Sequence, residues 1–106
     1  MHMSNTPTVP GFEIVETHGL VRGNIVKTKH IGRDFMAGIR NIVGGEVGSY
    51  TQMLTEAREE VLDRMCNDAR QMGANAIVNV RFATSAIGQG MAELLVYGTA
   101  VKVVKK

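Results

Sequence analysis

The side chains that could bind a metal ion are few in this sequence of 106 residues. Zinc and similar ions take three or four Cys, His or carboxylate ligands, in motifs such as C-x₂-C or H-x₃-H. The chain offers His18, His30 and Cys66, and no two of them have such a spacing. An oligomer could pool one histidine from each copy around a symmetry axis, which would give a ligand ring that sequence spacing does not show.

Each of these residues also has a structural interpretation, which we favour. Cys66 lies in an apolar helical pattern and is expected to pack as a small buried hydrophobic residue. His18 and His30 are expected to be exposed polar residues. Thioether sulfur could hold Cu(I), but four of the seven methionines fit helical packing better; these are Met36, Met53, Met65 and Met72.

A second group of residues could bind an anion. Gly45 and Ser49 precede a predicted helix, and backbone N–H groups at a helix start can hold phosphate or carboxylate. The segment is not a P-loop, because the G-x₄-G-K-[ST] pattern and its lysine are missing. Arg33 and Arg40 are seven residues apart on one face of another predicted helix, where they could clamp the same kind of anion. We favour a helix stop, an N-cap and salt bridges over this anion site.

Catalytic signatures are weaker still. The sequence has no Ser-His-Asp or Cys-His order, no carboxylate pair in an apolar setting and no cofactor fingerprint. We therefore expect a protein that is not an enzyme. A metal ion is the one cofactor that the sequence leads us to consider, and its identity is unknown. The open alternative is a small-anion or metabolite-binding protein, or an enzyme, with its site at subunit interfaces near Arg33 and Arg40.

The composition predicts one domain over residues 1–106. A net charge of +2, scattered along the chain, argues against a nucleic-acid partner. The single cysteine favours a reducing, cytoplasmic setting, and we find neither a secretion signal nor a membrane span. Residues 1–5 are expected to be disordered or derived from cloning, and Met1-His2 ahead of Met3 is interpreted as a cloning remnant.

The first half of the chain predicts strand and then helix. Residues 12–17 and 24–28 are β-type stretches that form one bent strand or two short strands, with glycines between them. Residues 31–42 predict a short amphipathic helix. Residues 50–72 predict a long helix, with Ser49 and Gln52 as a capping box and Gly73 at the stop.

Two strands and a connecting loop are predicted after the long helix. Residues 76–82 alternate, with Ala76, Val78, Val80 and Phe82 on one face. A loop is expected at 85–90. The last strand is apolar on both faces, with Leu94, Val96, Gly98 and Ala100 on one and Leu95, Tyr97, Val101 and Val103 on the other. One helix layer covers one face, so we expect a second subunit on the other. The order indicates an α+β fold with a mainly antiparallel sheet.

Several blocks, taken in order, make the chain similar to a known family. These blocks are Thr6-Pro7-Thr8, Gly19–Gly23, Ile31–Phe35, Ala37–Gly45, Gly48–Tyr50, Gly73–Val78 and Tyr97–Val101. They resemble the YbjQ-like family of small bacterial and archaeal proteins, and the match runs from about Thr6 to Val103. The family is largely uncharacterised and is described by name as heavy-metal-binding.

The resemblance implies a β-α-β-β core similar to the dodecin-like subunit fold, assembled into a ring-shaped pentamer. It also implies a binding or scaffold role in which the ligand is a metal ion. The metal interpretation rests on this resemblance alone, whereas self-association is also predicted by the doubly apolar last strand.

Overall fold

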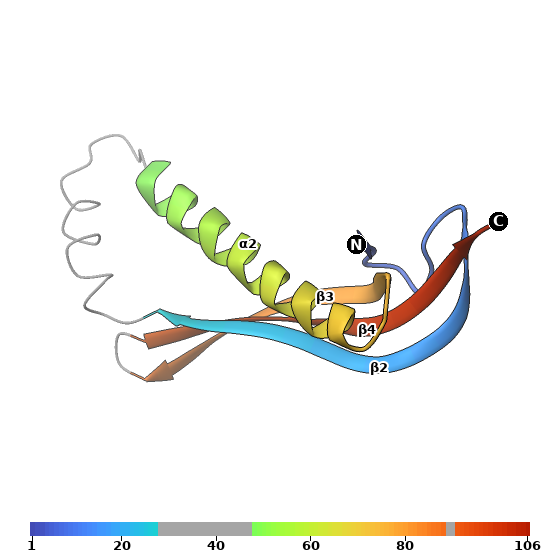
Figure 1. Cartoon of the computed structure of the whole chain (residues 1–106). Helices are drawn as coiled ribbons and strands as arrows, with labels where there is room; N and C mark the ends of the chain where they lie inside the picture. The colour runs from blue at the N-terminus through green and yellow to red at the C-terminus, as the bar shows by residue number, and fades with distance from the viewer. Residues whose placement is uncertain (28–47, 89–90) are drawn as a thin grey trace.

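The computed structural model describes residues 1–27, 48–88 and 91–106. Within them the chain forms β1 (His2–Met3), β2 (Phe12–Lys27), α2 (Gly48–Gln71), β3 (Ala76–Gly88) and β4 (Met91–Lys105). The strands make one sheet in the order β1-β3-β4-β2, with β1 parallel to β3 and the other pairs antiparallel (Figure 1). The predicted α+β class is confirmed, although the sheet is mixed. The short helix predicted at 31–42 lies outside the described residues.

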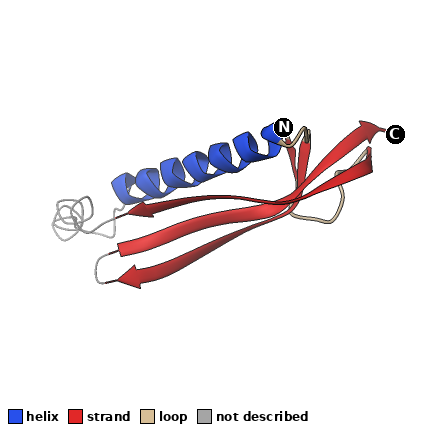
Figure 2. Ribbon diagram, turned by 60° about the horizontal axis from the view of Figure 1, so that its bottom comes forward, coloured by secondary structure: helices blue, strands red, loops and turns tan. Residues whose placement is uncertain are grey.

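The long helix is the element that the sequence predicted best. Its apolar residues recur every three or four positions, so one stripe faces the sheet, and α2 runs along one face of that sheet (Figure 2). The buried stripe consists of Ala57, Val61, Met65, Cys66 and Ala69. Gly73 has a φ of 86° and ends the helix as predicted. Met72 lies just past the end and is exposed rather than packed.

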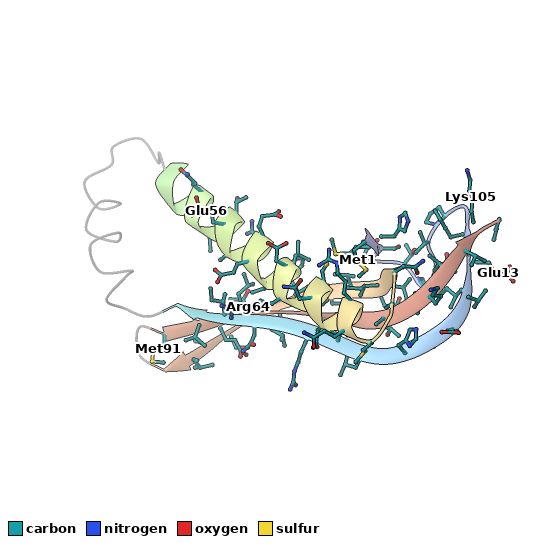
Figure 3. All side chains as sticks on the ribbon, in the orientation of Figure 1. Met1, Glu13, Glu56, Arg64, Met91 and Lys105 are labelled. Atoms are coloured by element: carbon teal, nitrogen blue, oxygen red, sulfur yellow. The ribbon has the colours of Figure 1, made fainter. Side chains whose placement is uncertain are left out.

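The helix approaches β2 closely because Gly23 has no side chain. A Cβ atom there would overlap the carbonyl oxygen of Val61 and crowd the Cβ of Arg64. Arg64 fixes the same contact by donating from Nη1 to the carbonyl oxygen of Asn24 at 2.6 Å (Figure 3). Its Nη2 contacts Glu60 Oε1 at 2.9 Å, as the i,i+4 spacing predicts.

β2 is one bent strand. Its pairing with β4 shifts in register between Ile14 and Glu16 and again between Thr17 and Gly19. Gly19 has a φ of 122°, which only glycine adopts at low cost, and this places a bulge where the sequence suggested one. Of the two predicted alternatives, the bent single strand is therefore the one observed.

β3 differs from its prediction in two ways. It continues to Gly88, so Ser85–Gly88 belongs to the strand rather than to a loop. A register shift between Val78 and Arg81, with Asn79 at a φ of 54°, also breaks the predicted alternation. Val80 joins the core under the helix, whereas Val78 points into a second cluster. A pattern of period two cannot reveal a bulge of this kind.

Both faces of β4 are apolar as predicted, but different parts of the chain pack against them. Val96 and Ala100 are buried under α2, as predicted. On the other face, Val101 and Val103 pack with Val9, and Phe12 and Ile14 adjoin them. The chain therefore covers part of its second face with its own N-terminal segment. Tyr97 remains 39% exposed and Leu20 of β2 66% exposed.

The subunit is elongated. Its radius of gyration is 17.1 Å and its extents are 53 × 27 × 17 Å, whereas a compact chain of this length has a radius of gyration of about 13 Å. The length follows from the strands, because 16 residues of β2 span roughly 54 Å. None of the helical residues that the structure describes forms a segment long and apolar enough to cross a membrane.

Candidate functional site

Cys66 lies where the helix meets the N-terminal strand. The residue is on the stripe of α2 that faces the sheet and is 5% exposed. β1 brings Met3 to this position, because Met3 pairs with Ile77, which shares the core with Cys66. The Sγ atom of Cys66 and the Sδ atom of Met3 are 3.7 Å apart. Two sulfur atoms from residues 63 positions apart in the sequence therefore meet.

The surroundings keep the thiol protonated. Burial raises the pKa of the Cys66 thiol, and Asp63 adds to this effect, while Arg70 and the α-amino group of Met1 act in the opposite direction. Met1 lies beside the C-terminal half of α2 (Figure 3). The protonated thiol donates weakly to the thioether of Met3. Met3 itself is 44% exposed, so the pair is reached from solvent on the Met3 side.

The chemistry of this pair is that of a soft ligand set. Thiolate and thioether sulfur select soft ions such as Cu(I), whereas three or four Cys, His or carboxylate ligands are needed for zinc. Residues 1–27, 48–88 and 91–106 contain no group of three or more His, Cys, Asp and Glu side chains that could hold a metal ion. Cys66 and Met3 therefore fit a soft ion with few ligands better than they fit zinc.

His18 lies at the register shift of β2 between Thr17 and Gly19. The sequence predicted an exposed histidine, but the side chain is only 23% exposed. Its Nε2 atom is shielded from solvent and lies 3.4 Å from Glu16 Oε2, without hydrogen-bond geometry. Among the described residues, His18 belongs to no group of three or more side chains that could hold a metal ion. His30 lies outside the described residues.

Of the four residues predicted to bind an anion, the structure describes only Ser49. Arg33, Arg40 and Gly45 lie outside the described residues. Ser49 is within the first turn of α2, which begins at Gly48. Gln52, the predicted second half of the capping box, donates from Nε2 to Glu56 Oε1 at 3.2 Å.

Sequence reasoning missed Met3. Residues 1–5 were set aside as disordered or derived from cloning, whereas the structure pairs His2 and Met3 with β3. A strand of two residues carries no periodicity, and its partner is more than 70 positions away in the sequence. Only the sulfur side chain at position 3 could have drawn attention to this end of the chain.

Comparison with known proteins places the chain in a family. A family sequence model described as "Putative heavy-metal-binding" matches residues 1–104. A UPF0145 protein of Thermococcus kodakarensis is 61% identical over 101 residues, covering 95% of this chain and 89% of the relative. A UPF0145 protein of Vibrio parahaemolyticus is 54% identical over 105 residues, covering 99% and 100%.

A solved structure has a similar fold. It is a protein of unknown function from Pediococcus pentosaceus, described as a member of the DUF74 family. The TM-score is 0.63 with 98% of each chain covered, at 13% sequence identity. This likeness concerns the fold, whereas the sequence matches identify the family. The chain belongs to the YbjQ-like family, together with the UPF0145 proteins of bacteria and archaea.

Proposed function

We propose that this protein is a non-enzymatic, homo-oligomeric binding protein that holds a soft metal ion at Cys66 and Met3. The observation that carries the metal assignment is the 3.7 Å separation of Cys66 Sγ and Met3 Sδ. The family description as heavy-metal-binding supports the same ligand class. When bound, the metal would replace the thiol proton, and the two sulfur atoms would serve as its ligands from this subunit.

Metal binding at this site would also hold the N-terminal strand β1 in place. Met3 is part of a strand of two residues, whereas Cys66 is fixed in the core by α2. A metal bridge between them would tie β1 to the helix. Because deprotonation must accompany binding, the affinity should increase with pH toward the raised pKa of Cys66.

The binding test uses Ag(I), a redox-stable stand-in for Cu(I), in competition with a chromophoric chelator. We expect one equivalent per subunit, loss of binding in Cys66→Ala, and an affinity about tenfold lower in Met3→Leu, which corresponds to about 1.4 kcal/mol. Met72→Leu is the matched control, because Met72 is 41% exposed against 44% for Met3. Equal affinities for the Met3 and Met72 variants would remove Met3 from the site. Unchanged binding in Cys66→Ala would refute the site.

We propose that the assembly is a cytoplasmic ring, pentameric and built from a dodecin-like subunit as the family resemblance implies. The elongated shape and the exposed Leu20 and Tyr97 support association. Light scattering should give a single mass five times the subunit mass of 11.5 kDa, about 58 kDa. A monomer at micromolar concentration would contradict the ring and leave the metal proposal standing, since both sulfur atoms come from one subunit.

A further inference from the structure

The outer edge of β3 is only half covered. β1 pairs with Ala76 and Ile77, and the following residues continue along the strand. Thr6 accepts from Asn79 N and Ser4 from Val80 N, each at 3.0 Å, and Asn5 accepts from the Arg81 side chain at 2.6 Å. Beyond Arg81, the part of the chain that the structure describes places no strand on this edge. Figure 2 shows α2 lying along one face of the sheet at this end.

The open half has the composition of a strand that pairs with another chain. The segment Phe82–Gly88 contains no charged residue and no proline. Phe82 is 47% exposed and Ile87 49% exposed. Strands that end a sheet in monomeric proteins are normally protected by lysines, prolines, bulges or short length. The uncharged edge Phe82–Ala86 pairs regularly with β4 up to the irregularity between Ala86 and Gly88, and it offers unpaired backbone groups to a partner.

The opposite edge of the same sheet supplies a matching partner. Among the described strands, β2 is the last in the order and has a neighbour on one side only. Phe82 and Gly23 pair with the same residue of β4, and so do Thr84 and Ile25. Ala86 and Lys27 likewise pair with the same residue of β4, so Phe82–Ala86 lies at the same height as Gly23–Lys27. Both strands are antiparallel to β4, so they run in the same direction.

The helix covers the inner face of the sheet at the β2 edge but leaves that face exposed at the β3 edge. The core under α2 includes Val21 of β2 and Val96 of β4, with Ile25 and Leu94 packed against it. Phe82 lies on the same side of the sheet, opposite Val96, yet remains half exposed because α2 lies over β2 and β4. A neighbouring subunit that joined through its β2 would bring its own helix to this uncovered side.

We propose that Phe82–Ala86 of each subunit pairs in parallel with Gly23–Lys27 of the next, which joins the sheets into a closed ring. The two edges lie at the same height and their strands run in the same direction. A rotation about an axis parallel to the strands therefore places the β3 edge of one subunit beside the β2 edge of the next. The two contact surfaces differ, so the interface is heterologous and closes by rotation. The Asn24 carbonyl already accepts from Arg64, and a carbonyl oxygen can accept a second bond. This inference rests on the proposed oligomer and identifies its surface.

The first test replaces the apolar edge by charge. Phe82→Lys with Ile87→Lys should convert the wild-type oligomer to single subunits with an unchanged circular dichroism spectrum. The matched control is Val15→Lys with Val104→Lys, because those residues are 51% and 44% exposed at the other end of the sheet. A monomeric wild type would overturn both the ring and this surface. An intact oligomer in the Phe82 and Ile87 variant would overturn only the surface.

Crosslinking tests the pairing without disturbing the fold, in a Cys66→Ala background. Ala83 and Asn24 are both opposite Leu95 of β4, so within one subunit they are two strand spacings, about 10 Å, apart. That exceeds the reach of a disulfide, about 7 Å between Cα atoms. Ala83→Cys combined with Asn24→Cys, or with Val26→Cys on the same face, should give ladders of covalently linked subunits. Disulfide dimers from Ala83→Cys alone would show a two-fold β3–β3 contact and refute the ring pairing.

Discussion

Gly23 sets how closely α2 lies on β2. A methyl group at this position would meet the backbone of Val61, which cannot move as the end of a flexible side chain can. We expect Gly23→Ala to lower the free energy of unfolding by about 2–3 kcal/mol, the size of an overpacking effect. Chemical denaturation measures this change. In Gly88→Ala the new methyl would meet only the Met91 sulfur at 3.7 Å, so a similar loss in that control would contradict the role assigned to Gly23.

Cys66 should make stability depend on pH in the alkaline range. Burial raises the pKa of its thiol in the folded state, so above the unfolded pKa, about 8.5, the unfolded chain loses this proton before the folded chain does. The folded state then binds more protons, and its stability decreases as pH rises toward the folded pKa. We expect the melting temperature of the wild type to fall more steeply above pH 8.5 than that of Cys66→Ala. Parallel pH profiles for the two proteins would show that the thiol does not contribute.

Cys66 and His18 differ in how well the sequence predicts the burial of their side chains. Cys66 belongs to a helical stripe whose period determines its burial, and the structure buries it as expected. His18 sits in a bulge that interrupts the alternation of β2, so a pattern of period two gives no orientation for its side chain. The contact between Cys66 and Met3 depends on the pairing of β1 with β3, which local pattern does not encode.

The N-terminal segment acts as a cover for the second face of the sheet. Val9 is 7% exposed and packs with Val78, Val101 and Val103. The ring of His2 lies at 4.6 Å from that of Phe12, next to the same cluster. The sequence indicated that the apolar outer face of the last strand needed a cover, and it assigned that cover to a second subunit. The chain itself supplies it at this end of the sheet.

Shortening Val9 tests this cover. Val9→Ala removes two buried carbon atoms and leaves a cavity, and we expect a loss of about 1–3 kcal/mol in the free energy of unfolding. Val104→Ala is the control, since Val104 is 44% exposed and its loss should stay within about 0.5 kcal/mol. Equal effects of the two substitutions would indicate that the N-terminal segment does not seal the cluster in solution.

Helix and strand were predicted from the sequence with unequal success. α2 was predicted within two residues at its start and one at its end, because apolar period, capping and a glycine stop all agree over this segment. β3 was predicted too short, because Ser85–Gly88 has the composition of a turn and yet pairs with β4 through Ala92 and Met91. Long-range pairing overrides local preference there, as it often does in strands.

The whole subunit is long and thin, so much of its sheet lies close to a surface. The N-terminal segment covers one end of the outer face, and α2 covers the inner face of β2 and β4. Among the described residues, exposed apolar side chains remain along the sheet, and those at the end away from the N-terminal segment include Val26, Phe82 and Ile87. The apolar surface needing a neighbour is therefore smaller than the sequence suggested, and it lies beside two open strand edges.

Stability should consequently depend on protein concentration. If folding and assembly are coupled, each tenfold increase in concentration stabilises a subunit of an oligomer by about 0.7–1.4 kcal/mol. For a chain of this length that corresponds to an increase of about 3–8 °C in melting temperature. Scanning calorimetry over two decades of concentration measures the slope for the wild type and for Phe82→Lys with Ile87→Lys. We expect the slope in the wild type and a flat profile in the variant. A flat profile in the wild type would mean that each subunit folds independently of its neighbours.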